Sequence, residues 1–381
     1  MKNVLLIGIY GVYNYGCEAI VRGTLNILKQ INPDINVTYA SYNYEDDKRR
    51  LTDCNITVIK RVLNKRWSFH RILRKFLSYI GYQYDIPFDS TCWVDKYDTV
   101  FSIGGDIYTI WPSNGYNKQL PTFLEKCQKK GLKYILWGAS VGKFESNPEA
   151  LSFFKNHLKK VDLIVAREPE TVSYLNSIGV SDNVIMAPDP AFSVNTMLKP
   201  RDSRPLKTIG LNLSPLSAEY KYKNRDEAIE CQSNAVIRLI DELDVDVVFL
   251  PHVVKTNFAD DDYLYMNEIF NKLSDEYKKR VSIVSNDPQF IGLKEIIDKC
   301  DFVIAARMHC AINAITRGCP TLFLSYSEKA KGMAEFIYGN REAVIDLNCF
   351  EDTMNLKLLI LQWNQNINYD YISRFDYKKL F

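Results

Sequence analysis

Residues 3–31 read NVLLIGIYGVYNYGCEAIVRGTLNILKQI. The run from Val4 to Ile9 is almost wholly apolar, which is typical of a strand buried on both faces of a parallel sheet. Glycines then indicate a turn, and residues 18–31 have the apolar spacing of a helix. A buried strand that leads through a glycine-rich turn into a helix is the repeating unit of α/β proteins.

The same alternation continues along the chain. Short apolar runs predict strands at residues 36–41, 99–103, 134–137, 163–166, 208–213, 246–250, 281–284, 302–305 and 321–324. Helical patterns fall between many of them, so the sequence predicts α/β architecture with parallel, helix-flanked sheets.

One segment breaks the alternation. Residues 188–205 hold four prolines and a polar run, which is typical of a linker. We expect a first domain over residues 1–195, a linker over 196–206, a second domain over 207–345, and a terminal helix and tail over 346–381. Two such domains joined by one linker predict a ligand cleft between them.

Composition narrows the class of protein. The chain has 381 residues, of which 46% are hydrophobic and 25% charged, and its net charge of +2 gives no sign of nucleic-acid binding. No apolar stretch approaches the roughly 18 residues of a membrane span. The first apolar run is too short for a signal peptide. Nine scattered cysteines without a C-x-x-C pair indicate reduced thiols, so we expect a cytoplasmic protein.

The glycine-rich turn at residues 8–18 is the first candidate binding loop. Glycines let backbone N–H groups approach a ligand, and a helix N-terminus favours anions. Asn14 and Glu18 lie in this turn. The pattern is neither G-x-G-x-x-G nor a P-loop. A tight turn without a ligand, with Glu18 favouring the helix start, explains it equally well.

Two more candidates follow buried strands. Gly104 and Gly105 allow close backbone approach, and Asp106 is then either a general base or a helix N-cap. Arg167 ends a strand, where it either binds a carboxylate or phosphate or pairs with the adjacent Glu168.

Arg307 and His309 form the most specific feature. They follow the apolar strand at 302–305, and side chains two residues apart share a face of extended backbone. Histidine is the natural proton-transfer group near neutral pH. The alternative is a hydrogen-bonded histidine that caps a helix. Lys329 and His252 also follow predicted strands and are further candidates.

No His, Asp and Glu cluster has the spacing of metal ligands, so we expect no metal. His70 and His157 lie in charged helical patterns, and we expect both at the surface.

The segment at residues 60–82 holds seven Lys or Arg and no acidic residue. At helical spacing one face collects Val62, Phe69, Leu73, Phe76 and Ile80. This pattern is typical of a helix that lies on anionic lipid. A core-packed helix with a solvated basic face remains the alternative.

Several blocks of sequence together resemble a known family. They are GIYGVYNYGCEAI (8–20), SIGGD (102–106), WGASVG (137–142), VAREPETVSYL (165–175) and RMHCAINAITRGCPTLFLSYSEKAKG (307–332). In this order they resemble the polysaccharide pyruvyl transferase family over residues 3 to 340. The resemblance implies two Rossmann-like domains in a glycosyltransferase-B-like arrangement. It also implies transfer of pyruvate from phosphoenolpyruvate to a sugar of a surface or capsular polysaccharide precursor, as a cyclic ketal with release of phosphate.

The resemblance gives the candidate residues roles. His309 is the expected acid, and Asp106 or Glu18 takes a hydroxyl proton. Substrate contacts are expected from Arg307, Arg167, Lys329, Asn14, Glu18, Gly104, Gly105 and His252. Asp106 and Cys17 stand where the family often has other residues, which puts their roles in question.

The expected partners are phosphoenolpyruvate and a saccharide acceptor. No cofactor is expected, because phosphoenolpyruvate itself is the donor. The basic segment at 60–82 permits a lipid-linked acceptor and peripheral contact with the inner membrane face. Two rivals stay open: a glycosyltransferase of the same architecture that uses a nucleotide-sugar, and a non-catalytic carbohydrate-binding partner in glycan assembly.

Overall fold

The computed structural model of the chain describes residues 1–61, 69–82, 94–105, 107–110, 115–116, 120–194, 197, 201–202, 204–254, 259–325, 328–362, 367 and 369–381. Contacts divide the chain into two compact units. The first comprises residues 1–12, 28–167 and 171–187, and the second comprises 13–27, 168–170 and 188–381.

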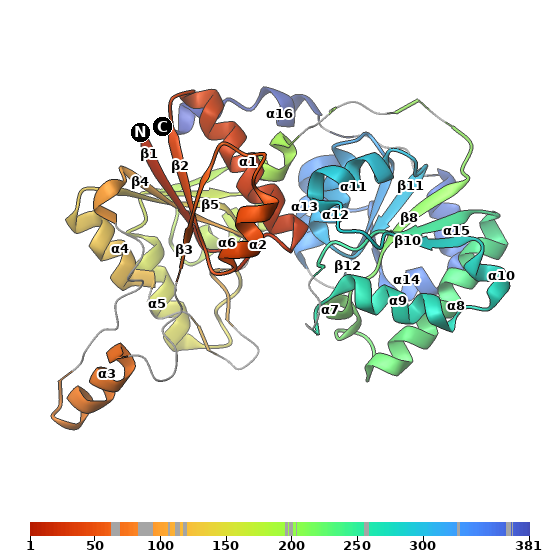
Figure 1. Ribbon diagram of the computed structural model, residues 1–381, viewed down its shortest axis with the longest axis horizontal. Helices are drawn as coiled ribbons and strands as arrows, with labels where there is room; N and C mark the ends of the chain where they lie inside the picture. The colour runs from red at the N-terminus through yellow and green to blue at the C-terminus, as the bar shows by residue number, and fades with distance from the viewer. Residues whose placement is uncertain are drawn as a thin grey trace. The chain divides into compact units, whose positions relative to one another are not determined.

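The first unit is built on a sheet that has seven strands within the described residues, all paired in parallel (Figure 1). The strands are β1 (Asn3–Ile7), β2 (Asn36–Ser41), β3 (Thr57–Lys60), β4 (Thr99–Ile103), β5 (Lys133–Ala139), β6 (Leu163–Ala166) and β7 (Val184–Met186). Their order is β3-β2-β1-β4-β5-β6-β7. The chain therefore reverses its direction of travel across the sheet between β1 and β4, which makes the ends of these strands the switch point of a doubly wound fold.

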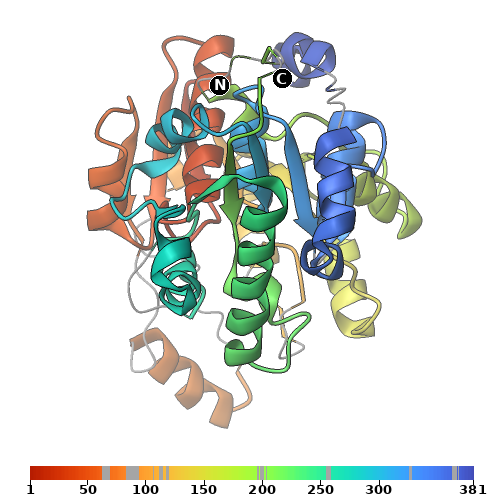
Figure 2. The ribbon, with the colours of Figure 1, turned by 90° about the vertical axis from the view of Figure 1, so that its right-hand side faces the viewer.

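The second unit repeats this plan with six parallel strands in the described chain, in the order β10-β9-β8-β11-β12-β13. The strands are β8 (Thr208–Asn212), β9 (Asp246–Phe249), β10 (Val281–Ile283), β11 (Phe302–Ala305), β12 (Thr321–Ser325) and β13 (Val344–Asp346). The switch point lies between β8 and β11. Figure 2 shows this unit, in which α8 (Arg225–Leu243) and α9 (Asp262–Lys272) pack against each other.

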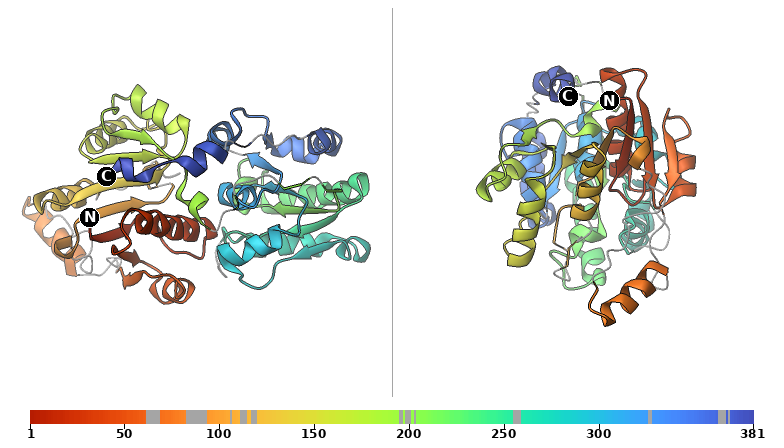
Figure 3. Two further views of the ribbon diagram at one scale, coloured as in Figure 1. Left: turned by 90° about the horizontal axis from the view of Figure 1, so that it is seen from above. Right: turned by 90° about the vertical axis from the view of Figure 1, so that its left-hand side faces the viewer.

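Helices cover both faces of the first sheet (Figure 3). The elements up to the second sheet are α1 (Tyr15–Ile31), α2 (Tyr44–Arg50), α3 (Phe69–Tyr79), η1 (Val94–Lys96), α4 (Leu120–Lys129), α5 (Pro148–Leu158), α6 (Pro169–Ser177) and η2 (Pro190–Ser193). Side chains of β4 and β5 pack on α4 and α5, for example Val100, Leu136, Phe123 and Phe154. Burial of such side chains contributes about 1.5–3 kcal/mol each.

The remaining elements follow the second sheet. They are α7 (Pro215–Ala218), α10 (Asp275–Lys278), α11 (Gln289–Ile297), α12 (Met308–Ile315), α13 (Glu328–Tyr338), α14 (Leu347–Glu351), α15 (Thr353–Gln362), α16 (Tyr369–Arg374) and η3 (Tyr377–Leu380). Among these, α12 contacts β11, β12 and η2. The predicted fold class, two parallel α/β sheets, is confirmed.

Helix α1 follows the first strand in sequence, but most of it packs within the second unit. The contacts of residues 13–27 are mainly with that unit. Gly23 explains this, since a Cβ at that position would lie 1.8 Å from the carbonyl oxygen of Pro190. Only a glycine lets the helix backbone approach η2 so closely. The domain limits expected from the sequence stay a prediction, and the contact-based division differs from them at α1 and at Pro188.

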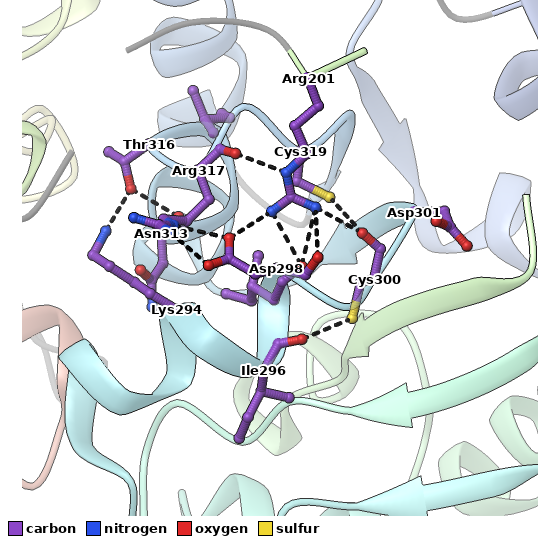
Figure 4. A network of polar contacts seen from close by, with 12 residues as sticks. Arg201, Lys294, Ile296, Asp298, Cys300, Asp301, Asn313, Thr316, Arg317 and Cys319 are labelled. Carbon is purple, nitrogen blue, oxygen red and sulfur yellow. Dashed lines mark hydrogen bonds and ion pairs between the residues drawn. The ribbon is translucent and has the colours of Figure 1, made fainter. Parts of the chain in front are cut away.

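The segment that the sequence marks as a linker is tied to the second unit through Arg201 (Figure 4). Its guanidinium donates to the carbonyl oxygens of Ile297, Cys300 and Arg317, and to the carboxylate of Asp298 at 3.0 Å. Arg317 also donates to Asp298. Burial works against the ionised carboxylate, but these two arginines lower the pKa of Asp298 overall. The guanidinium of Arg201 lies at the end of α11, where it donates to carbonyl groups that a helix terminus leaves unpaired.

His157 lies in the core of the first unit, so its expected surface position is wrong. The residue is 2% exposed, its Nε2 atom lies 3.1 Å from the hydroxyl of Tyr108, and the two rings stack. The helical pattern around it is charged, but His157 falls on the apolar side of α5 beside Phe154. Burial lowers the pKa of His157 to about 4, so the imidazole is neutral in the folded protein near pH 7.

We therefore expect His157→Phe to weaken the acid sensitivity of the fold. The unfolded chain binds a proton near pH 6.5 but the folded one only near pH 4, so stability is complete above pH 6.5 and is lost as the pH falls toward 4. The loss attributable to His157 is about 3 kcal/mol. Urea unfolding at pH 7.5 and pH 4.5 measures it. An identical pH dependence in wild type and variant would contradict the assignment.

In the described part of the chain no helix is long and apolar enough to cross a bilayer. The cysteines described there are all free thiols, and Cys127, Cys300, Cys310 and Cys319 are buried.

Candidate active site

Arg307 organises the strand ends at the switch point of the second unit. It is the N-cap residue of α12, and its backbone N–H donates to Asn212, the last residue of β8. Its guanidinium contacts Asp262 at 2.8 Å and Asp260 at 2.5 Å. The second oxygen of Asp262 accepts from the backbone of His252. One ion pair thus joins the ends of β8, β9 and β11 and the start of α9.

These contacts leave Arg307 only partly available to a ligand. Its side chain is 12% exposed, and desolvation works against its charge, but Asp262 and Asp260 outweigh this effect and raise its pKa. The guanidinium is therefore a permanent cation. Among the described residues its Nε and Nη2 atoms have carboxylate partners and its Nη1 atom has none. Its expected role in anion binding stays a prediction that now rests on that one nitrogen.

His309 lies in the first turn of α12, packed against α1. A Cβ at Gly16 would lie 2.5 Å from Nδ1 of the imidazole, so the ring rests directly on the α1 backbone. Its Nε2 atom lies 3.4 Å from a carboxylate oxygen of Asp189, which is fully buried. The distance suits an ion pair when the imidazole is protonated, although Nε2 has no well-aligned hydrogen bond within the described chain. A histidine held between a glycine and a buried carboxylate is oriented for proton transfer.

His252 lies close to His309 and Arg307. It is 1% exposed, and neither ring nitrogen has a hydrogen-bond partner among the described residues. Its ring packs edge-on against Tyr15 and Phe290. Burial, and then the positive charges of His309 and Arg307, hold the pKa of His252 well below its usual range. This imidazole is therefore neutral near pH 7, where it offers one donor and one acceptor.

The turn before α1 is held by its own residues. Asn14 accepts from the N–H groups of Gly16 and Cys17, so it caps the helix. Tyr15 donates its N–H to the carbonyl of His252. Glu18 is fully buried, pairs with Arg22 at 2.7 Å, and accepts from the backbone of Phe290. These contacts give Asn14 and Glu18 structural roles, and their expected substrate contacts stay predictions.

The candidates of the first unit gather at its own switch point. Gly104 has φ +120, and a Cβ at Gly105 would lie 2.4 Å from Nη2 of Arg167. Arg167 is 2% exposed and donates to Ser140 at 2.9 Å. Gly105 thus makes room for the guanidinium at the carboxyl ends of β4, β5 and β6. Asp106 lies outside the described residues, and so does the side chain of Lys329 at the start of α13.

The structure brings His309, Arg307 and His252 together at the strand ends of the second unit. It brings Gly105 and Arg167 together at the strand ends of the first unit. The sequence reasoning missed Asp189 and the contact of Gly16. Asp189 stands between two prolines in the segment read as a linker. An Asp before Pro is a signal for an N-cap, and Asp189 does accept from Ala191 in η2. The Asp-Pro signal in the sequence therefore predicts that Asp189 caps η2, but it does not predict the contact of Asp189 with His309.

Solved structures with a similar fold include UDP-GlcNAc 2-epimerases and a protein in complex with UDP-glucose. The UDP-GlcNAc 2-epimerase of Methanocaldococcus jannaschii has a TM-score of 0.56 and 12% identity, over 97% of this chain and 96% of that one. The enzyme of Neisseria meningitidis bound to UDP-GlcNAc has a TM-score of 0.55 and 13% identity, over 99% and 95%. Anabaena HepE with UDP-glucose has a TM-score of 0.55 and 11% identity, over 95% and 90%. At these identities the likeness shows the fold alone, which is glycosyltransferase-B-like.

Comparison with curated proteins gives no match. The family model for polysaccharide pyruvyl transferase, in contrast, matches residues 14–328. That range runs from Asn14 at the start of α1 to the first residue of α13, and it contains His309, Arg307, His252 and Asp189. The chain belongs to the polysaccharide pyruvyl transferase family.

Proposed function

We propose that this protein transfers the pyruvyl group of phosphoenolpyruvate to a sugar of a surface or capsular polysaccharide precursor as a cyclic ketal. The observation that carries the proposal is His309, which is held between Gly16 and the buried Asp189 within the range that matches the family. Ketal formation needs a proton donor beside an anion site, and the proposal assigns both to the strand ends of the second unit.

The anion site of this proposal is the start of α12. The first N–H groups of any helix lack partners within the helix. At α12 the side chain of the N-cap residue, Arg307, accepts no hydrogen bond from them. His252 adds two ring nitrogens that are buried without hydrogen-bond partners among the described residues. Buried polar atoms in native proteins are nearly always satisfied, so these nitrogens indicate a polar ligand. A carboxylate or phosphate fits, because the helix dipole favours negative charge and the Nη1 atom of Arg307 is a donor without a carboxylate partner among the described residues.

The proposed reaction has a simple balance of atoms. His309 gives a proton to C3 of phosphoenolpyruvate, and the oxygen of one sugar hydroxyl forms a bond to C2. A second hydroxyl oxygen of the same sugar then bonds to C2 as the C2–O bond to phosphate breaks. The two hydroxyl protons replace the one given to C3 and protonate the phosphate. Asp189 steadies the imidazolium while His309 carries its proton. Asp106 is the proposed base that accepts the proton of a sugar hydroxyl.

A phosphate-release assay tests this proposal. Purified protein is mixed with phosphoenolpyruvate and a panel of free and lipid-linked acceptors of galactose, mannose and glucose type. The expected result is phosphate release that depends on one class of acceptor. Absence of release with every acceptor, together with thermal stabilisation by a nucleotide-sugar but not by phosphoenolpyruvate, would support a glycosyltransferase instead.

The first unit offers an aromatic surface suited to the acceptor. Tyr10 follows β1, is 64% exposed, and stacks on Tyr42 at 5.5 Å. Tyr42 directly follows β2, and the guanidinium of Arg61, which directly follows β3, lies 4.4 Å from its ring. This ion–ring contact fixes Tyr42, which in turn supports Tyr10. An exposed, fixed ring presents an apolar face to the C–H groups of a sugar, with a hydroxyl at its edge.

We expect Tyr10→Ala to raise the KM for the acceptor roughly fivefold to tenfold, because an aromatic contact of about 1 kcal/mol is lost. The KM for phosphoenolpyruvate should not change. Tyr10→Phe keeps the ring and serves as the control. Steady-state kinetics with each substrate varied in turn measures the effect. Equal KM values for the acceptor in Tyr10→Ala and wild type would remove Tyr10 from the acceptor site.

A further inference from the structure

Helix α3 carries a face of large apolar side chains that the described protein leaves in contact with solvent. The side chains are between 53% and 77% exposed, and they are Phe69, Ile72, Phe76, Tyr79 and Ile80. At 3.6 residues per turn they fall on one side of the helix, together with the half-buried Leu73 and Leu77. Scattered exposed apolar residues are ordinary, but a contiguous group of this size marks an interaction surface.

The rest of the helix is polar and basic. Arg74, Lys75 and Ser78 are exposed; Arg74 and Ser78 fall on the side opposite to Phe76, and Lys75 lies at the flank of the apolar face. The segment at 60–82 has no acidic residue. Arg61 is 3% exposed against Tyr42 and takes no part in the surface. The polar side of α3 therefore carries positive charge only.

Figure 1 and the right-hand view in Figure 3 show the ribbon of α3 apart from the sheet of the first unit. The alternative of a core-packed helix does not fit the described side chains of residues 69–79, whose large apolar members are exposed, and residue 62 of the expected face lies outside the described residues. The apolar side has the composition of a core helix, but its large side chains are more than half exposed.

We propose that α3 is an interfacial anchor that lies in the plane of an anionic membrane. A helix of 11 residues is too short for a bilayer core, which needs about 20. An apolar face that holds Phe and Ile, with a basic polar side, is suited to the boundary between lipid headgroups and acyl chains. Tyr79 and Tyr82 near the end of the segment are 77% and 61% exposed, and Tyr is favoured at that boundary. The positive charge selects an anionic lipid surface over a neutral one.

The proposal does not depend on the proposed activity, because it is tested by binding. Full-length protein is sedimented with sucrose-loaded vesicles of phosphatidylcholine alone, or with phosphatidylglycerol at a third of the lipid. We expect binding to the anionic vesicles at low salt, and binding at least tenfold weaker both to the neutral vesicles and at high salt.

Three variants separate the contributions. Ile72→Ser with Phe76→Ser should abolish binding to both kinds of vesicle. Arg74→Gln with Lys75→Gln should weaken anionic binding roughly fivefold for each charge and reduce its salt dependence. Leu358→Ser with Leu361→Ser is the matched control, because these α15 side chains are also exposed, at 48% and 61%, and the variant should bind as wild type does.

Two outcomes would overturn the anchor. One is the absence of vesicle binding by wild type at low salt. The other is vesicle binding that the Ile72 and Phe76 substitutions leave unchanged. If those substitutions instead dissolve an oligomer that does not bind vesicles, the face is a contact between copies of the chain. All variants should unfold at the wild-type temperature, since no described core contact is removed.

Discussion

Replacing His309 by alanine is expected to lower acceptor-dependent phosphate release by at least about 10²-fold, because positioned proton transfer contributes about 10²–10⁴ to a rate. The effect should fall on kcat, since the N–H groups of α12 that are proposed to bind the anion remain. His157→Phe is the matched control, because it removes a histidine that lies in the core of the first unit. Its kcat should equal that of wild type at pH 7.5.

Two neighbours of His309 extend this prediction. Asp189→Asn removes the carboxylate 3.4 Å from Nε2 and should lower kcat roughly tenfold to hundredfold, with the KM for phosphoenolpyruvate unchanged. Gly16→Ala places a methyl group 2.5 Å from Nδ1 and should displace the ring. Near wild-type turnover in His309→Ala would exclude His309 as the acid, whatever the two neighbours do.

Replacing Gly23 by alanine is expected to lower the free energy of unfolding by about 3 kcal/mol or more. The new methyl group would lie 1.8 Å from the carbonyl oxygen of Pro190 and 2.4 Å from its carbon. Both are backbone atoms, so α1 and η2 have to separate. Because Asp189 immediately precedes Pro190, kcat should fall as well.

Gly292→Ala is the control for this prediction. Gly292 lies in α11, and an added Cβ meets only the side chain of Pro288, at 3.1 Å. Alanine is favoured over glycine inside a helix by about 1 kcal/mol, so this variant should be as stable as wild type or more so. Urea unfolding midpoints give both values. A Gly23→Ala protein as stable as wild type would show that the close approach of α1 to η2 is not required.

Sequence periodicity was sufficient for the long, buried elements. The strands at 36–41, 99–103, 163–166 and 302–305 begin and end in the structure where the apolar runs do. Such strands are apolar on both faces, so their signal is strong. The edge strands β3, β7 and β13 were missed. They have three or four residues and lie half exposed, which leaves no continuous apolar run.

Helix α2 was missed for a related reason. Its sequence, YEDDKRR, has no apolar periodicity, and contacts that no local pattern encodes hold it in place. Buried Asp47 accepts from Val12, Ser41 and Tyr39. Tertiary hydrogen bonds of this kind override weak local signals.

The candidate site was predictable in position but less so in its contacts. The end of an apolar parallel strand places His309 and Arg307 at the ligand edge of the sheet from sequence alone. The partners that decide their chemistry come from distant parts of the chain. Asp262, which neutralises Arg307, is 45 residues away in sequence, and Asp189 lies in a segment whose prolines gave a different signal. Only the fold reveals such pairs.

The most direct test of the account is the mass of the acceptor after reaction with phosphoenolpyruvate and purified protein. Pyruvyl transfer predicts that the acceptor gains the mass of one pyruvate less one water, with one phosphate released for each ketal formed. It also predicts that the gain disappears with His309→Ala and persists with His157→Phe. An acceptor that gains no mass from phosphoenolpyruvate but gains a hexose from a nucleotide-sugar would contradict the account.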